Sequence, residues 1–481
     1  MGLEKNLYMI EFTGVLEMTE QRVVTKQTSH VRWAITSLLT LAIAVNYIDR
    51  IIWVIAEPKF SQTFGWYTGS GPLPALALKN IALILFIWSI AYAFFNFPGG
   101  WIVDKLGIRK GMATFFTIWS VFTAATAATF NFISMAVVRA IMGAGEGPVW
   151  PINGKNARTW SHPTEESTMF TLAGSGQAVG PIIAAVIGAL QVTYWGWQIT
   201  FVFWGVLGLI FAAVWYFYVR DSPRAHKGVS ENELQRIESG RGKTQDTESA
   251  HLSSKDTWKI TLKLAFTTRA GIGELLIFIS FAYILGAILS WVPTYFYSSF
   301  LHNVTSTGLY SGAVYASLLG GYLASGPIND GLSKRMGRAS GRRVAALIPM
   351  TLMVLFVAAS YFTGTAGEII PTAILLALAG GVMNITVGSW AANAITISPG
   401  ETSATVYGFY NGVLNIMGAF TSLIIATLAI RYGFPAAITS TVFFMLLFIL
   451  AYSVFITQKS MDQAIEKGNI MLAAARSKAT Y

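Results

Sequence analysis

The sequence contains no cysteine and little charge. Its 481 residues include no Cys, and 12% are Asp, Glu, Lys or Arg, against roughly 25% in soluble domains. The absence of cysteine excludes disulfide bonds, thiolate metal sites and cysteine nucleophiles. Because 54% of the residues are hydrophobic, a soluble core of this size would lack the polar surface needed to cover it. The composition therefore indicates a protein that folds in a lipid bilayer.

Twelve apolar stretches are each long enough to cross a bilayer, which takes about 20 residues. We therefore predict an all-α membrane protein with twelve transmembrane helices in two six-helix halves. The expected spans are 33–57, 79–102, 111–130, 132–153, 168–192, 197–219, 271–297, 308–328, 343–363, 370–397, 403–428 and 434–457. The predicted organisation is a tail over 1–31, bundles over 32–219 and 265–457, a linker over 220–264 and a tail over 458–481.

The polar segments add two expectations. The first thirty residues mix charges of both signs, so we expect no cleavable signal peptide. The linker carries both signs of charge and few aromatic residues, which is typical of a solvated, partly helical strap rather than a folded domain. The two tails look similar to the linker.

Lys and Arg are distributed unevenly between the two sides of the predicted membrane. Three of the 33 lie in loops opposite the N-terminus (Lys59, Lys79 and Arg431), two lie within spans (Arg50 and Arg139), and the rest lie on the N-terminal side. Cytoplasmic loops carry the excess of Lys and Arg, so both termini are predicted to be cytoplasmic. The net charge of +10 is explained by this asymmetry, and we expect no nucleic-acid partner.

A short motif recurs at equivalent places in the two halves. Gly100-Trp-Ile-Val-Asp104-Lys-Leu-Gly107-Ile-Arg109-Lys110 follows the second span, and a looser version, from Gly326 to Arg338, follows the eighth. The first copy resembles the G-x-x-x-D-x-x-G-x-R-K loop of the major facilitator superfamily. The resemblance implies a major facilitator fold over about 32–457. It assigns a conformational latch, which holds the halves together in one state, to Gly100, Asp104, Gly107, Arg109 and Lys110.

Four ionisable side chains lie deep within the predicted spans, where a charge costs about 2.5–3.5 kcal/mol even on the lenient insertion scale. They are Asp49 and Arg50 in the first span and Arg139 and Glu146 in the fourth. Positions 139 and 146 are two turns apart and share a helix face, so we expect pairs of Asp49 with Arg139 and of Arg50 with Glu146. A purely structural set of ion pairs is the alternative.

Other ionisable residues give weaker signals. Glu57 and Glu274 lie close to span ends, so we expect their side chains to reach water. No His lies within a span, which argues against a histidine proton relay.

Local sequences around these charges resemble one branch of the superfamily. They are Asn46-Tyr47-Ile48-Asp49-Arg50, the segment from Arg139 through Gly143-Ala-Gly145-Glu146-Gly147 to Pro151, and Trp291-Val-Pro293-Thr-Tyr295. They are similar to the anion:cation symporter family, which includes sugar-acid and aromatic-acid permeases, sialin and the vesicular glutamate transporters. The resemblance implies proton-coupled uptake of organic anions, with Arg50 and Glu146 at the family's arginine and glutamate positions.

The sequence also departs from that branch. The loop from Phe64 to Leu76 is long and rich in Gly and Pro, and the seventh span lacks a buried basic residue. The segment Gly176-Gln177-Ala-Val-Gly180-Pro181 resembles an antiporter motif found elsewhere in the superfamily. This last feature keeps exchange open as an alternative.

The second half offers uncharged polar and aromatic groups within its spans. Amides and hydroxyls suit a carboxylated or polyhydroxylated ligand, although each Asn can also join helices and each aromatic ring can simply pack. Because transporter sites form between the halves near the midplane, we predict a cavity there. The polar groups are Tyr283, Asn384, Ser389, Trp390, Asn393, Asn411 and Asn415. The predicted substrate-binding residues are Arg50, Tyr47, Gln177, Tyr283, Trp390, Asn393, Asn411 and Asn415.

The sequence thus predicts a secondary transporter that imports a small organic anion with protons by alternating access. Asp49, Glu146 and Arg139 are the predicted proton-coupling residues, and Arg50 is the predicted anchor for the substrate carboxylate. An organic-anion exchanger is the main alternative, and a solute sensor is a weaker one. We expect no enzymatic activity, no cofactor and no metal.

The expected partners are the anion, protons and lipid, with the protein a monomer in a bacterial inner membrane. The absence of cysteine and of long outer loops favours that membrane. Asn303-Val-Thr305 forms a glycosylation tripeptide, which is common by chance. Trp and Tyr favour aromatic acids and Asn and Gln favour sugar acids, so the identity of the anion stays open.

Overall fold

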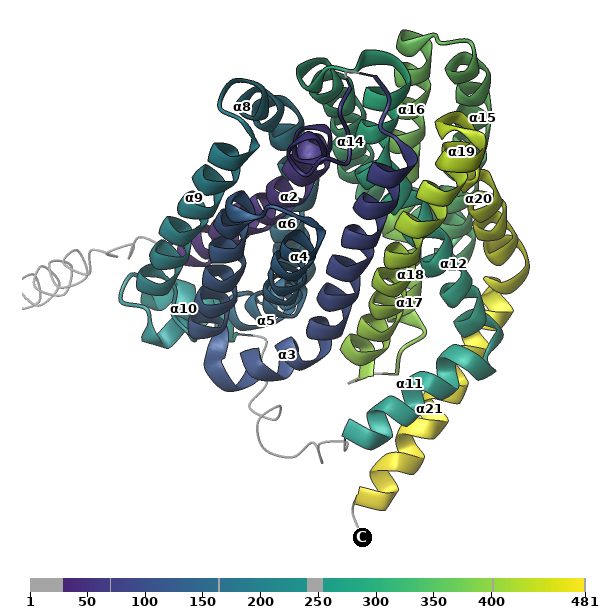
Figure 1. The fold of residues 1–481 in the computed structure, drawn as a ribbon. Helices are drawn as coiled ribbons and strands as arrows, with labels where there is room; N and C mark the ends of the chain where they lie inside the picture. The colour runs from purple at the N-terminus through teal and green to yellow at the C-terminus, as the bar shows by residue number, and fades with distance from the viewer. Residues whose placement is uncertain (1–28, 70, 163–164, 240–253, 400–401, 480–481) are drawn as a thin grey trace, which may run out of the picture.

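The computed structural model describes residues 29–69, 71–162, 165–239, 254–399 and 402–479, and all regular structure within them is helical. Two groups of helices lie side by side (Figure 1). The first group comprises α2 (Val31–Thr63), α3 (Ala75–Ala125), α4 (Phe132–Glu146), α5 (Val149–Trp160), α6 (Glu166–Gly174), α7 (Gly176–Ile183), α8 (Ala189–Tyr194) and α9 (Trp197–Tyr218).

The second group begins after the linker. It comprises α12 (Arg269–Gly286), α13 (Val292–Phe296), α14 (Val304–Met336), α15 (Arg338–Thr365), α16 (Ile369–Ile385), α17 (Val387–Thr396), α18 (Ser403–Tyr432), α19 (Phe434–Thr439) and α20 (Thr441–Leu450). Short π-helical turns lie within or at the ends of these spans at η2 (Ala184–Gly188), η4 (Ala287–Trp291), η5 (Tyr297–Leu301) and η7 (Ala451–Phe455). Of two 3-10 turns, η1 (Thr126–Ala128) follows α3 directly, and η3 (Pro223–Ala225) lies in the linker after α9.

Within the described residues, eleven helices are long and apolar enough to cross a membrane. They coincide with all the predicted spans except 308–328. That segment lies within α14, a helix of 33 residues whose second half carries Asn329, Asp330 and Lys334. The helices are therefore where the sequence predicts them, and the twelfth crossing and the orientation of the termini stay predictions.

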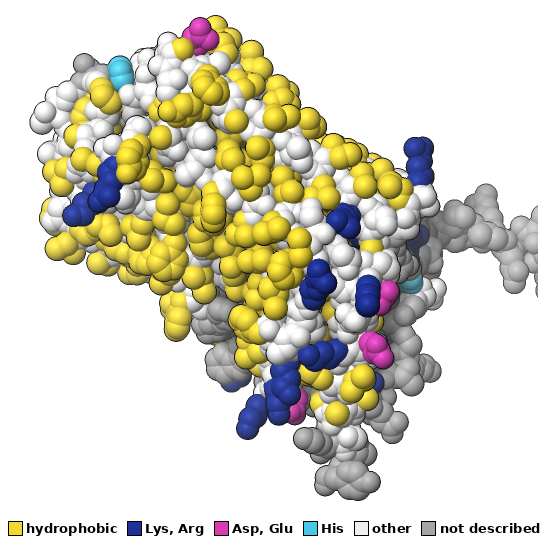
Figure 2. Space-filling model, turned by 90° about the vertical axis from the view of Figure 1, so that its right-hand side faces the viewer, with side chains coloured by type: hydrophobic (Ala, Val, Ile, Leu, Met, Phe, Trp, Pro, Cys, Tyr) yellow, Lys and Arg dark blue, Asp and Glu magenta, His cyan; other side chains and the backbone are white. Residues whose placement is uncertain are grey.

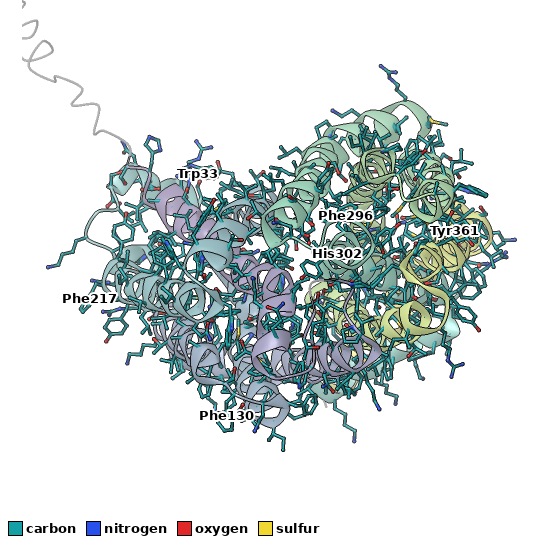
Figure 3. The ribbon with its side chains drawn as sticks, turned by 45° about the horizontal axis from the view of Figure 1, so that its top comes forward. Trp33, Phe130, Phe217, Phe296, His302 and Tyr361 are labelled. Carbon is teal, nitrogen blue, oxygen red and sulfur yellow. The ribbon has the colours of Figure 1, made fainter. Side chains whose placement is uncertain are left out.

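The outer surface of the bundle is apolar because lipid, rather than water, is its solvent. Phe130 and Phe217 are 73% and 71% exposed and point outward at the rim of the molecule (Figure 3). Figure 2 shows hydrophobic side chains over the left and centre of one face, with most of its Lys and Arg toward the lower right. This distribution fits an integral membrane protein.

The helix α3 contains a break at the motif that the two halves share. Gly107 has φ of 78° inside it, so two helical stretches are joined at a sharp turn. A Cβ built on Gly107 would lie 2.2 Å from Oδ1 of Asp221, and left-handed φ values also favour glycine. The turn therefore favours glycine at position 107, and a larger residue there would also displace the exposed Asp221 side chain.

The linker is more closely attached than a solvated strap would be. Its helix α10 (Glu231–Glu238) docks at the start of α2, whose first residues have no side-chain cap of their own. Glu233 is fully buried there and accepts hydrogen bonds from the backbone N–H groups of Val31 and Arg32 at 3.2 and 3.1 Å. A carboxylate at a helix N-terminus satisfies free donors and meets the positive end of the helix dipole.

We call the end of the molecule that carries α10 the linker side. The helix α11 (Ser254–Thr267) follows on this side, where it lies against α21 (Gln458–Ala479) in Figure 1. Lys467 Nζ of α21 donates to Thr267 Oγ1 at 2.9 Å. The predicted tail over 458–481 is therefore largely a helix that packs against the linker.

Candidate functional site

An ion pair joins α2 to α4 inside the first group. Arg50 Nε lies 2.9 Å from Glu146 Oε2, and the side chains are 16% and 0% exposed. This contact confirms the predicted pairing of Arg50 with Glu146. Nη2 of Arg50 and Oε1 of Glu146 are buried and make no hydrogen bond to any described residue. The pair therefore keeps a spare donor and a spare acceptor.

Three aromatic rings surround the guanidinium group of Arg50. Its Cζ lies 4.6 Å from the ring centroid of Tyr47 and 4.7 Å from those of Trp88 and Tyr92. Aromatic faces attract cations, most strongly where water is excluded. Trp88 and Tyr92 are missing from the sequence prediction, although their spacing of four residues on α3 puts them on one helix face.

Glycines in α4 and at its C-terminal cap allow these rings to approach the ion pair. A Cβ on Gly143 would lie 2.6 Å from the carbonyl oxygen of Trp88, and one on Gly147 would lie 2.8 Å from that of Tyr92. Both distances are shorter than real Cβ contacts, so only glycine permits this closeness between α3 and α4. The segment between Arg139 and Pro151 thus supplies glycines that let α3 and α4 pack closely, in addition to its charged residues.

The glycines of the segment that resembles an antiporter motif also serve packing. A Cβ on Gly176 would lie 2.3 Å from the carbonyl oxygen of Thr40, and one on Gly180 would lie 2.4 Å from that of Ala44. The backbone of α7 therefore contacts that of α2 directly, as small residues permit in membranes. Between these glycines, Gln177 Oε1 accepts a hydrogen bond from the Tyr47 hydroxyl at 3.2 Å. The structure thus brings Tyr47 and Gln177 to Arg50.

The second predicted ion pair does not form. Asp49 is 1% exposed and accepts a hydrogen bond from Thr123 Oγ1 at 3.1 Å, and no ion pair within the described residues joins it to Arg139. Arg139, also 1% exposed, lies with its Cζ 5.0 Å from the ring of Trp53 and its Nη1 3.2 Å from Met142 Sδ. The expected Asp49–Arg139 pair is therefore wrong, because aromatic and polar neighbours hold each side chain separately.

Glu57 and Glu274 are not at the water boundary. Their exposed fractions are 1% and 0%, so the expectation that they reach solvent is wrong. For Glu57 the reason is that α2 continues through Pro58 to Thr63, beyond the predicted end of the span. For Glu274 the reason is that α12 already begins at Arg269 and packs against both α11 and α21.

The predicted residues of the second group bond mainly within that group. The Tyr283 hydroxyl is 2.7 Å from Ser440 Oγ, and Trp390 packs with its ring 4.8 Å from those of Phe278 and Phe281. Asn415 Nδ2 donates to the carbonyl oxygen of its own helix at Asn411. Tyr283 is fully buried and Trp390 is 5% exposed, so packing within the second group accounts for both rings.

Asn393 belongs to a separate polar cluster. Its Oδ1 accepts from Arg342 Nη1 at 3.3 Å, and its Nδ2 donates to the Tyr452 hydroxyl at 3.3 Å. Asn384 Nδ2 donates to the carbonyl oxygen of Leu318 at 2.9 Å, which joins α16 to α14. The role of Asn393 as a substrate residue stays a prediction.

The predicted latch is described only in part. Arg109 donates from its backbone N–H to Asp221 Oδ1 at 2.9 Å and from Nε to the carbonyl oxygen of Tyr216 at 2.7 Å. These partners belong to the first group and the linker, and Lys110 is exposed. The side chain of Asp104 and the surroundings of Gly100 lie outside what the structure describes, so the latch stays a prediction.

One hollow of about 330 Å³ lies away from these charges, on the side opposite the linker. Leu73, Ser298 and Phe434 are among its lining residues, none of which is charged. It contains no residue that the sequence analysis predicts to bind substrate. Its lining therefore offers no cationic side chain to hold an anion.

Comparisons with known proteins agree with this architecture. The model of the Major Facilitator Superfamily matches residues 39–422. A hexuronate transporter of Bacillus subtilis (strain 168) is 27% identical over 337 residues, covering 70% of this chain and 72% of that protein. A protein of Escherichia coli (strain K12) named "Probable galactarate/D-glucarate transporter GudP" is 25% identical over 449 residues, covering 89% and 94%.

Solved structures show the same fold. A D-xylose-proton symporter superposes with a TM-score of 0.65 at 14% identity, covering 89% of this chain and 99% of that one. A bacterial homologue of the human lysosomal transporter Spinster, in an inward-facing and occupied conformation, has a TM-score of 0.61 at 14% identity, covering 94% and 97%.

These similarities support a transporter of organic anions and confirm the resemblance seen in the motifs around Arg50, Gly107 and Glu146. The many apolar helices agree with an integral, multi-pass membrane protein. The chain belongs to the Major Facilitator Superfamily, whose matched members here are transporters rather than enzymes.

Proposed function

We propose that the protein imports a small organic anion, a sugar acid or a related carboxylate, together with protons by alternating access. The observation that carries this proposal is the Arg50–Glu146 pair, in which a buried cation has one carboxylate partner and a spare donor at Nη2. A guanidinium group binds carboxylates through two parallel hydrogen bonds. Arg50 therefore supplies the anchor for an anionic substrate.

Coupling follows from competition for Arg50. A substrate carboxylate that binds the guanidinium draws it away from Glu146, which is fully buried. A buried carboxylate without a cationic partner is costly, and taking up a proton removes that cost. Substrate binding and proton binding therefore favour one another, as any coupling free energy requires. With Glu146 neutral, the loaded site carries no unpaired charge when the two groups of helices move.

Asp49 and Arg139 are the other two residues that the sequence predicts to take part in proton coupling. Asp49 has a single hydroxyl donor, Thr123, and its Oδ1 is buried without a partner, so it is a second candidate proton carrier. Arg139 lies over Trp53 and Trp88 at 5.0 and 5.4 Å. We propose that Arg139 stabilises the negative charge of both acids from a distance.

The substrate class is proposed from the neighbours of Arg50 and from the relatives. Tyr47 and Gln177 supply a hydroxyl and an amide close to the guanidinium, and such groups recognise the hydroxyls of a sugar acid. The hexuronate and galactarate/D-glucarate transporters among the relatives favour the same class. We propose that Asn411, Asn415, Trp390, Tyr283 and Asn393 complete the site from the second group when the two groups close over substrate.

Transport into proteoliposomes tests the proposal. Purified protein is reconstituted with hexuronate, galactarate, D-glucarate and sulfoacetate as separate labelled probes, with and without an imposed pH gradient. The proposal predicts that an inward proton gradient drives accumulation of at least one sugar acid above its external concentration, and that a protonophore abolishes it. Accumulation that needs an internal anion and ignores the pH gradient would instead establish an exchanger.

A further inference from the structure

Glu57 is a buried carboxylate that the proposed coupling mechanism does not use. It lies on α2 beyond Asp49 and Arg50, toward the side opposite the linker, and is 1% exposed. Its Oε2 accepts a hydrogen bond from Thr294 Oγ1 at 2.6 Å. Thr294 belongs to α13 in the second group and is 2% exposed. The contact therefore joins the two groups of helices across their interface.

The surroundings of Glu57 provide little to stabilise a negative charge. Its Oε1 is buried and has no hydrogen-bond partner among the described residues. Arg139 of α4 and Tyr315 of α14 are the titratable groups that interact with it from neighbouring helices, and no ion pair within the described residues joins Glu57 to Arg139. The Tyr315 hydroxyl donates to the carbonyl oxygen of Leu289 at 2.8 Å. An ionised carboxylate held by one hydroxyl alone is costly to bury.

Other contacts show that the two groups meet tightly on this side. Thr193 Oγ1 of α8 is 2.9 Å from Thr305 Oγ1 of α14. A Cβ built on Gly308 of α14 would lie 2.1 Å from the carbonyl oxygen of Ala185. Figure 3 places Phe296, two residues beyond Thr294, toward the middle of the molecule among the helices of the second group. Glu57 is thus enclosed by a closed interface, and parting that interface would open it to water.

We propose that Glu57 is an additional proton-binding site, loaded from the side opposite the linker, and that this side closes when its carboxyl group is neutral. The inference rests on the proposed function, because it assumes that the interface opens and closes during transport. In the open state a hydronium ion transfers a proton to the carboxylate and leaves as water. In the closed state the neutral acid accepts the Thr294 hydrogen bond without burying a charge.

The absence of cysteine makes a direct distance measurement possible. Spin labels are attached to Tyr194→Cys and Tyr432→Cys, whose side chains are 77% and 67% exposed at the ends of α8 and α18. Double electron–electron resonance spectroscopy then gives the distribution of distances between the two spin labels, and hence between the two groups on this side. The protein is measured in lipid nanodiscs without substrate, from pH 5.5 to 8.5. The readout requires no knowledge of the substrate.

The proposal predicts that the long-distance, open population grows as the pH rises, because deprotonated Glu57 resists closure. Glu57→Gln, a neutral side chain of the same shape, removes this pH dependence and keeps the short distance throughout. Thr294→Val, which retains shape but loses the donor, enlarges the open population at every pH. Glu368→Gln, which neutralises an exposed acid at the start of α16, serves as the matched control and leaves the pH dependence unchanged.

Two results would overturn the proposal. The first is the same pH dependence in Glu57→Gln as in the parent protein, and the second is a distance distribution that ignores pH in the parent. Failure of the proposed function gives a different outcome, namely no accumulation of any sugar acid in the proteoliposome assay while the distances still respond to pH. The two claims are therefore tested separately.

Discussion

At the scale of single residues, the guanidinium group of Arg50 is held firmly by its neighbours and still has one N–H group available to bind a ligand. Glu146 holds its Nε, three aromatic rings lie 4.6–4.7 Å from its Cζ, and Nη2 has no partner among the described residues. A lysine ammonium in the same place would keep the charge but lose the planar fork and its fit to a carboxylate. The geometry of Arg50, as well as its charge, is therefore expected to matter.

Arg50→Lys should weaken substrate binding by at least about tenfold, which corresponds to ~1.4 kcal/mol, and should reduce uptake to a similar or greater extent. Substrate-induced thermal stabilisation of the purified variant measures the loss of binding. Arg431→Lys is the matched control, because Arg431 is exposed at the end of α18. Normal binding by a folded Arg50→Lys protein would contradict the anchor role.

The sequence predicted some of these residues and missed others for identifiable reasons. Charges are rare in membrane spans, so Arg50 and Glu146 stand out and their pairing follows from helix geometry. Trp88 and Tyr92 do not stand out, because aromatic residues are common on membrane helices and only the contact with Arg50 distinguishes these two. Glu57 was misjudged because Pro58 looks like the end of a span, whereas α2 continues past it to Thr63.

At the scale of elements, glycines determine how closely α7 approaches α2. Backbone oxygens of Thr40 and Ala44 occupy the places where Cβ atoms of Gly176 and Gly180 would lie. The segment Gly176 to Pro181 therefore has a structural explanation that does not depend on exchange. The same packing positions Gln177 beside Tyr47.

Gly180→Ala should destabilise the protein by about 1–3 kcal/mol, because an added Cβ would lie 2.4 Å from the Ala44 oxygen and overpacking forces backbones apart. The midpoint of thermal unfolding in detergent measures the effect. Gly418→Ala on α18 is the control, since no atom lies within 4 Å of the place where its Cβ would lie, and it should change stability by less than about 1 kcal/mol. Equal effects of the two substitutions would show that the α2–α7 contact is not tight.

Helix positions were largely predictable from the sequence, but the attachment of the linker was not. Apolar runs of spanning length fix the helices because a bilayer requires them. By contrast, the burial of Glu233 against the first residues of α2 depends on the three-dimensional path of the linker. Nothing in the local pattern of Glu231–Glu238 distinguishes such a docked helix from a solvated one.

At the scale of the whole molecule, the closed contacts between the two groups that involve Glu57, Thr193 and Gly308 all lie on the side opposite the linker. Alternating access requires these contacts to part while others form on the linker side. The predicted latch around Asp104 lies on the linker side, far along α3 from the ion pair. Its effect is therefore expected on the equilibrium between states rather than on substrate contacts.

Asp104→Asn should impair transport several-fold while changing substrate affinity only modestly, since a ligand's apparent affinity falls only by the fraction of competent state that is lost. Initial uptake rates and equilibrium binding of the same preparation separate the two effects. Asp462→Asn, the same substitution at an exposed aspartate of α21, is the matched control and should leave both quantities nearly unchanged. Complete loss of binding by a folded Asp104→Asn protein would contradict the latch.

The central claim is that substrate competes with Glu146 for Arg50, so that substrate binding promotes protonation of Glu146. The most direct measurement is the number of protons taken up when substrate binds, obtained by titration calorimetry in buffers of different ionisation enthalpy. The account predicts net proton uptake in the parent protein and a decrease of about one proton in Glu146→Gln, which should still bind substrate, because linked equilibria share one free energy. An unchanged proton uptake in Glu146→Gln would contradict the account.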